Sequence, residues 1–122
     1  GVRCNLIEWR SSLLHHRIYA ERIRKDPTLL QRAIAMLEKG IAENGGTVGH
    51  RMWLSLLHQP SETVETLMLS ETPEGRLLRS NSPFARLIGV TKTSERIALW
   101  RQAKHELAAQ DVSNALSGTE PR

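Results

Sequence analysis

The chain has 122 residues, of which 39% are hydrophobic and 25% are charged, as is usual for a soluble globular protein. It has no apolar run of the roughly 18 residues that a membrane-spanning helix needs, and its single cysteine, Cys4, excludes an internal disulfide and a cysteine-rich zinc site. The formal net charge of +4 favours anionic partners, such as nucleic acid or an acidic protein.

The first half of the chain predicts three helices. Apolar residues recur every three to four positions up to Arg24, as a helix with one buried face requires. Asp26 and Pro27 are typical of a helix start, and the Gly45-Gly46 pair is typical of a helix end. The predicted helices span residues 5–24, 27–44 and 48–59.

The second half predicts three shorter helices and one long one. Ser61, Thr72 and Ser82 are each expected to cap a short helix, and Gly89 ends the last of the three. Thr93 or Ser94 is expected to cap the long final helix. The sequence therefore predicts an all-α fold, a compact orthogonal bundle of six to seven helices forming one domain over residues 1–110. Residues 111–122, where the apolar pattern is lost, are expected to form a flexible tail.

Three tryptophans, Trp9, Trp53 and Trp100, fall on three different predicted helices, and we expect them to pack together in the core. The histidines do not predict a metal site, because HExxH is absent and the adjacent His15 and His16 point to different sides of a helix. No phosphate-binding glycine loop and no GxSxG motif occurs. The sequence thus favours a non-enzymatic protein without a cofactor.

Two arginine–histidine pairs keep a ribonuclease open as the alternative. Small all-helical bacterial ribonuclease toxins of the HEPN class use an arginine followed after four to six residues by a histidine. The spacing of Arg10 and His15 resembles that pattern, and so does that of Arg51 and His58. The histidine would move the 2′-hydroxyl proton while the arginine holds the phosphate. Such a pair would have to meet in a cleft, across a homodimer.

The stretch around Gly89 resembles the middle of a helix-turn-helix motif. Ala85, Gly89, Val90 and Thr91 match in order a small residue, a turn glycine, an apolar residue and a helix cap. In that motif the glycine adopts the left-handed turn conformation. The buried isoleucine expected six residues after the glycine is absent, because that position is Glu95.

The segment LLRSNSPFARLIG, residues 77–89, also resembles a segment near the C-terminus of small uncharacterised bacterial helical domains. The resemblance implies partner binding or transcriptional control in regulatory or toxin–antitoxin-like gene pairs, without catalytic residues. It rests on the following matched residues: Leu78, Arg79, Ser80, Ser82, Pro83, Phe84, Ala85, Glu95 and Arg96.

Charge, composition and resemblance together predict a cytoplasmic antitoxin-type or regulatory module. It would bind a protein partner through an apolar helix face, nucleic acid through arginines, or both; a purely structural role in a larger assembly is the other alternative. The residues expected to bind nucleic acid are Arg76, Arg79, Arg86, Lys92, Arg96 and Arg101.

Overall fold

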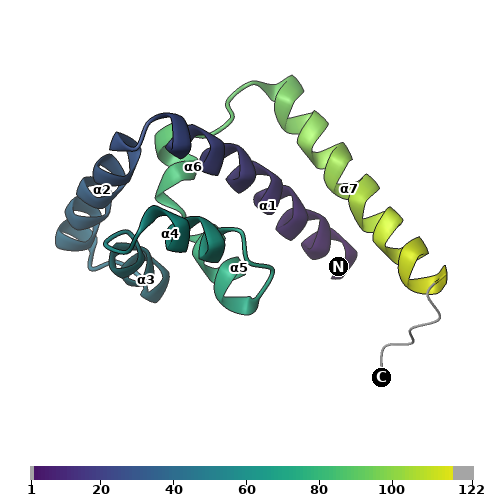
Figure 1. Ribbon diagram of the computed structural model, residues 1–122, viewed down its shortest axis with the longest axis horizontal. Coiled ribbons are helices and arrows are strands. Elements are labelled where there is room, and N and C mark those ends of the chain that lie inside the picture. Colours follow the sequence, from purple (N-terminus) through teal and green to yellow (C-terminus); the bar gives the residue numbers. More distant parts are fainter. Residues whose placement is uncertain (1, 117–122) are drawn as a thin grey trace. The chain divides into compact units, whose positions relative to one another are not determined.

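The computed structural model describes residues 2–116, with side chains from Asn5 onward, and every regular element in this range is an α-helix (Figure 1). The predicted all-α class is confirmed. The side chain of Cys4 lies outside the described part. The helices are α1 (Val2–Lys25), α2 (Thr28–Asn44), α3 (Val48–Leu56), α4 (Ser61–Met68), α5 (Pro73–Ser80), α6 (Pro83–Ile88) and α7 (Thr93–Leu116).

The final helix is longer than the sequence pattern predicts. α7 continues to Leu116, so residues 111–116 of the expected flexible tail are helical. This stretch contains no proline or glycine, and the first glycine after it is Gly118. Without a helix-breaking residue, the loss of a regular apolar pattern at Asp111 was not enough to end the helix. Residues 117–122 lie outside the described part.

The chain forms two compact units. The first combines residues 1–14 with residues 91–122, and the second comprises His15–Val90. α1 therefore contributes its first half to one unit and its second half to the other, and α7 belongs to the first unit.

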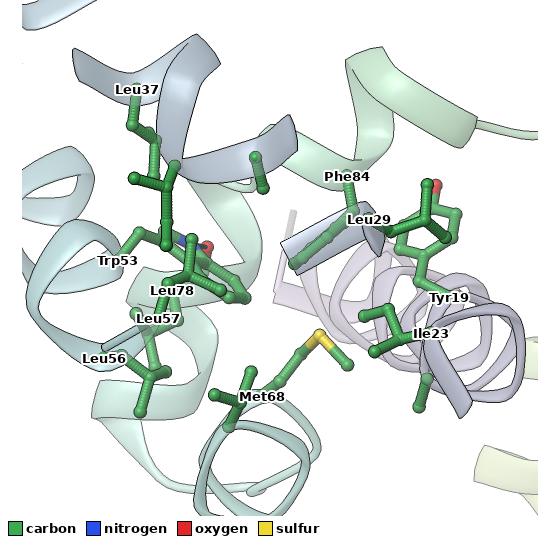
Figure 2. Close-up of a cluster of buried hydrophobic side chains, with 14 residues drawn as sticks. Tyr19, Ile23, Leu29, Leu37, Trp53, Leu56, Leu57, Met68, Leu78 and Phe84 are labelled. Carbon is green, nitrogen blue, oxygen red and sulfur yellow. Dashed lines mark hydrogen bonds between the residues drawn. The ribbon is translucent and has the colours of Figure 1, made fainter. Parts of the chain in front are cut away.

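The core of the second unit centres on Trp53 and Phe84, which are both fully buried (Figure 2). Their rings meet edge to face, with centroids 5.5 Å apart and planes inclined by 76°, an arrangement that aromatic quadrupoles favour. The indole N–H of Trp53 donates to the carbonyl of Leu78, so the buried polar atom is satisfied. Met68 is also fully buried in this cluster and brings α4 into the core.

The first unit has a smaller core, built from Ile7 and Leu14 of α1 and from Ala103 and Leu107 of α7. The two tryptophans of this unit are not part of it: Trp9 is 42% exposed and Trp100 is 38% exposed. The prediction that the three tryptophans pack together is therefore wrong. Trp9 lies on the side of α1 away from Ile7 and Leu14, and Trp100 lies at the edge of the α7 stripe formed by Ala103 and Leu107.

A buried arginine joins α4 to α5. Arg79, only 6% exposed, donates from Nη1 to the carbonyl of Met68 at 2.9 Å and to that of Ser70 at 2.6 Å. These carbonyls lie at the C-terminal end of α4, where helix carbonyls lack partners and a cation is favoured. Arg79 is among the residues expected to bind nucleic acid, and in the structure its guanidinium is buried and donates to carbonyls inside the fold.

Most of the predicted helix starts are confirmed. The Thr72 hydroxyl accepts from the N–H of Gly75 at the start of α5, and the Ser82 hydroxyl accepts from that of Phe84 at the start of α6. Ser61 is not a cap, because Pro60 occupies the N-cap position of α4 and no side chain caps that helix. Asp26 accepts from the N–H of Thr28 although it precedes the N-cap position of α2.

We expect Arg79→Met to lower the free energy of unfolding by about 2–4 kcal/mol, because the buried carbonyl of Met68 and the partly buried carbonyl of Ser70 lose their donor. Urea denaturation followed by circular dichroism measures this loss. Arg32→Met, at an exposed position of α2, is the control and should stay within about 0.5 kcal/mol of the parent protein. Equal midpoints for the two variants would contradict a structural role for Arg79.

Substitutions at two glycines test the close approach of the Ser70 carbonyl to the start of α5. A Cβ at Gly75 would lie 2.0 Å from the carbonyl oxygen of Ser70, whereas a Cβ at Gly40 would meet nothing within 4 Å. Gly75→Ala should therefore destabilise the protein by about 1–3 kcal/mol through overpacking. Gly40→Ala should stabilise it by about 0.5–1 kcal/mol, because alanine favours a helix interior. Thermal unfolding of both variants checks the signs, and two stabilising changes would contradict the close approach at Gly75.

Candidate nucleic-acid interface

The six residues expected to bind nucleic acid divide equally between the two units. In the second unit Arg76 is half-buried and Arg79 is buried, which leaves Arg86 as the exposed member. In the first unit all three members are exposed, and they lie on α7 or directly before it. These are Lys92, Arg96 and Arg101.

The backbone at Gly89, between α6 and α7 in the sequence, differs from that expected for the turn glycine of a helix-turn-helix. Gly89 has φ −61° and ψ 156°, an extended conformation instead of the left-handed one that the motif requires. Residues 89–92 form no regular structure, and α6 and α7 belong to different units. Gly89 is needed for another reason, since a Cβ there would lie 2.1 Å from the carbonyl oxygen of Ala85. The predicted left-handed turn at Gly89 is therefore wrong.

The arginines of the two arginine–histidine pairs are each bonded to another part of the chain. Arg10 and His15 are five positions apart on the continuous helix α1, about 140° apart around its axis. Arg10 is also held by α7, where it contacts Glu106 at 3.5 Å and donates to Gln110 at 3.1 Å.

Arg51 lies in the first turn of α3, whereas His58 follows the end of that helix. The Nη2 of Arg51 donates to the carbonyl of Gly45 at 3.0 Å. In both pairs the arginine therefore has hydrogen-bond partners elsewhere in the chain.

One face of α7 carries a row of exposed cationic and apolar side chains. Arg96, Trp100 and Lys104 are spaced four residues apart, so they form a continuous stripe along the helix. Ile97 and Arg101 follow the first two members by one residue and flank the stripe. All five side chains are exposed; we refer to them as the α7 face.

Most of the α7 face lies to one side of the stripe that packs on α1, and Arg96 is in line with that stripe near the start of the helix. The stripe carries Ala103 and Leu107, which are buried with the α1 residues of the first unit. Glu106 also points to α1, because its carboxylate contacts Arg10. This arrangement leaves α7 anchored through one stripe while the α7 face remains exposed.

The charges of the α7 face are not neutralised by neighbouring carboxylates. Within the described part of the chain, Arg96, Arg101 and Lys104 form no ion pair. Guanidinium and ammonium groups of this kind bind phosphate oxygens, and an exposed indole offers a flat surface on which a base stacks. The geometry can therefore hold a polyanion that also has aromatic rings.

Trp100 was not a functional candidate from the sequence, because all three tryptophans were expected in the core. The signal available in the sequence is Ile97, which lies outside the stripe of Leu99, Ala103 and Leu107. Trp100 is close in angle to Leu107 and lies at the edge of that stripe. A helix with that pattern has apolar surface that a single neighbour does not cover.

No described helix is long and apolar enough to cross a bilayer. In the part of the chain that the structure describes, no three or more His, Cys, Asp or Glu side chains are grouped to hold a metal ion. Comparisons with protein-family models, with curated proteins and with solved structures find no match.

Proposed function

We propose that the chain is a non-enzymatic regulatory module of the antitoxin type and that it binds single-stranded nucleic acid through the α7 face. The observation that supports this most directly is the exposed order of cation, indole and cation formed by Arg96, Trp100 and Lys104. The antitoxin type itself rests on the resemblance of the LLRSNSPFARLIG segment to small bacterial regulatory domains.

The spacing of this stripe suits a flexible nucleic-acid strand. Four residues of helix advance by about 6 Å, so Arg96 and Lys104 lie about one helical turn to either side of Trp100. A base stacked on the indole would place its neighbouring phosphates near these two cations. Stacking needs an unpaired base, which is why a single strand is favoured over a duplex.

A protein partner is the second candidate, and the apolar residues on α7 favour it. Ile97 is 46% exposed, Val112 59% and Leu116 82%, and none of these side chains assists phosphate binding. An acidic amphipathic helix would complement both the cations and these apolar side chains. The nucleic-acid titrations below separate the two candidates.

The charge of the α7 face is tested by fluorescence-anisotropy titration with labelled single-stranded RNA and with duplex DNA, at low and moderate salt. Arg96→Gln and Lys104→Gln should each weaken binding and lower the magnitude of the salt slope by about one. Arg32→Gln removes an exposed cation from the other unit and is the matched control. Unchanged salt slopes in both α7 variants would contradict the proposal.

The stacking role of the indole is tested separately. Trp100→Ala should weaken binding of single-stranded RNA by about 1–3 kcal/mol, the range found for stacked bases, with a smaller effect on the duplex. Trp9→Ala is the control, because Trp9 is 42% exposed, close to the 38% of Trp100, but lies on α1. If neither RNA nor DNA binds the parent protein, binding of a protein partner by α7 replaces nucleic-acid binding as the proposed function.

A further inference from the structure

An open pocket of about 480 Å³ lies within the second unit and is unrelated to the α7 face. It forms where the C-terminal end of α2, the start of α3 and the corner between α5 and α6 meet. The apolar part of its wall comes from Leu37 and Ile41, and the polar part includes His50, Ser82 and Arg86. A cavity of this size fits a small ligand or one side chain of a peptide.

The corner that forms one wall is held rigidly by Asn81. Its Oδ1 accepts from the Thr47 hydroxyl at 3.0 Å, and its Nδ2 donates to the carbonyl of Leu77 at 3.0 Å. The side chain of Asn81 occupies the space beside Gly49, where an added Cβ would approach Nδ2 to 2.3 Å. A wall fixed in this way needs little ordering when a ligand binds.

The charged side chain that lines the pocket is the cation Arg86. The lining contains no aspartate or glutamate, and Arg86 is exposed and forms no ion pair within the described chain. The Nδ1 of His50 accepts from the N–H of Thr47 at 3.2 Å, so in the neutral ring the proton is on Nε2, which can donate. The hydroxyl of Ser82 accepts from the N–H of Phe84 and retains its own proton for donation.

Gly40 keeps one side of the pocket open. This residue lies inside α2 and lines the pocket, yet a Cβ there would meet no atom within 4 Å. Glycine weakens a helix interior, and here the packing of the fold gives no reason for it. A larger side chain at this position would occupy the pocket instead of the core.

We propose that this pocket binds a carboxylate carried on a short aliphatic group. The carboxylate would pair with the guanidinium of Arg86, which matches its planar geometry, and the aliphatic part would cover Leu37 and Ile41. One guanidinium balances one carboxylate, and the apolar wall disfavours a fully hydrated anion such as phosphate. The same chemistry is offered by a free aliphatic acid and by the C-terminal leucine of a peptide.

The test is an NMR titration of backbone amides with four probes: hexanoate, hexanamide, acetyl-leucine and acetyl-leucinamide. Saturable shifts are expected at Gly46, Thr47, His50 and Ser82 with at least one of the two acids. The matching amide should bind about tenfold more weakly or worse, because it lacks the charge-assisted hydrogen bonds to Arg86. Binding of hexanoate alone identifies a free acid as the source, and binding of acetyl-leucine alone identifies a peptide end.

Three variants make the test specific. Arg86→Gln should weaken acid binding about tenfold or more, and Gly40→Leu should abolish it by filling the pocket, while Arg32→Gln should leave it unchanged. Circular dichroism checks that all three variants remain folded. No saturable shift with either acid, equal affinity of acid and amide, or binding that survives Gly40→Leu would overturn the proposal. Because Gly40→Leu leaves α7 intact, RNA titrations of this variant test the α7 face independently.

Discussion

The interaction on which the second unit depends is the pair of hydrogen bonds from Arg79 to the carbonyls of Met68 and Ser70. α5 has only eight residues, and an isolated helix of that length is marginal in water. Arg79 fixes it to the end of α4, and the bond from Trp53 to the Leu78 carbonyl fixes it to α3. The corner after α5, with α6 and the nearby pocket, is positioned by these contacts.

The loop that supplies the Ser70 carbonyl to Arg79 also approaches Gly75 closely. The carbonyl of Ser70 accepts from Arg79 and also lies where a Cβ of residue 75 would be. Glycine at this position therefore allows the loop before α5 to fold onto the helix. The hydroxyl of Thr72 then caps the helix through the N–H of Gly75, so three residues close together in sequence set the start of α5.

Local chemistry explains why much of the fold is predictable from the sequence. The starts of α5 and α6 follow from Thr72-Pro73 and Ser82-Pro83, because a hydroxyl cap and a proline act within one turn of the helix. The role of Arg79 is not predictable in this way. Its partners belong to the end of another helix, and arginine is usually exposed, so a surface position was the natural expectation.

The candidate interface was also predictable from the sequence only in part. The cations Arg96 and Arg101 could be selected from the sequence because the residue type itself suggests phosphate binding. Trp100 could not, since a tryptophan on a helix is core or surface depending on which stripe meets a neighbour. In the structure α1 residues pack on Ala103 and Leu107, and Trp100, at the edge of that stripe, is 38% exposed between two cations.

The most direct test of nucleic-acid binding by the α7 face is tryptophan emission in the Trp9→Phe protein during titration with single-stranded RNA. This protein retains Trp53, which is fully buried, and Trp100, which is 38% exposed, so a ligand reaches only the latter. We expect saturable quenching that follows the binding curve measured by anisotropy and disappears in the Trp9→Phe/Trp100→Phe protein. Binding without any change in emission would contradict nucleic-acid stacking on the α7 face, because the base would then not stack on the indole of Trp100.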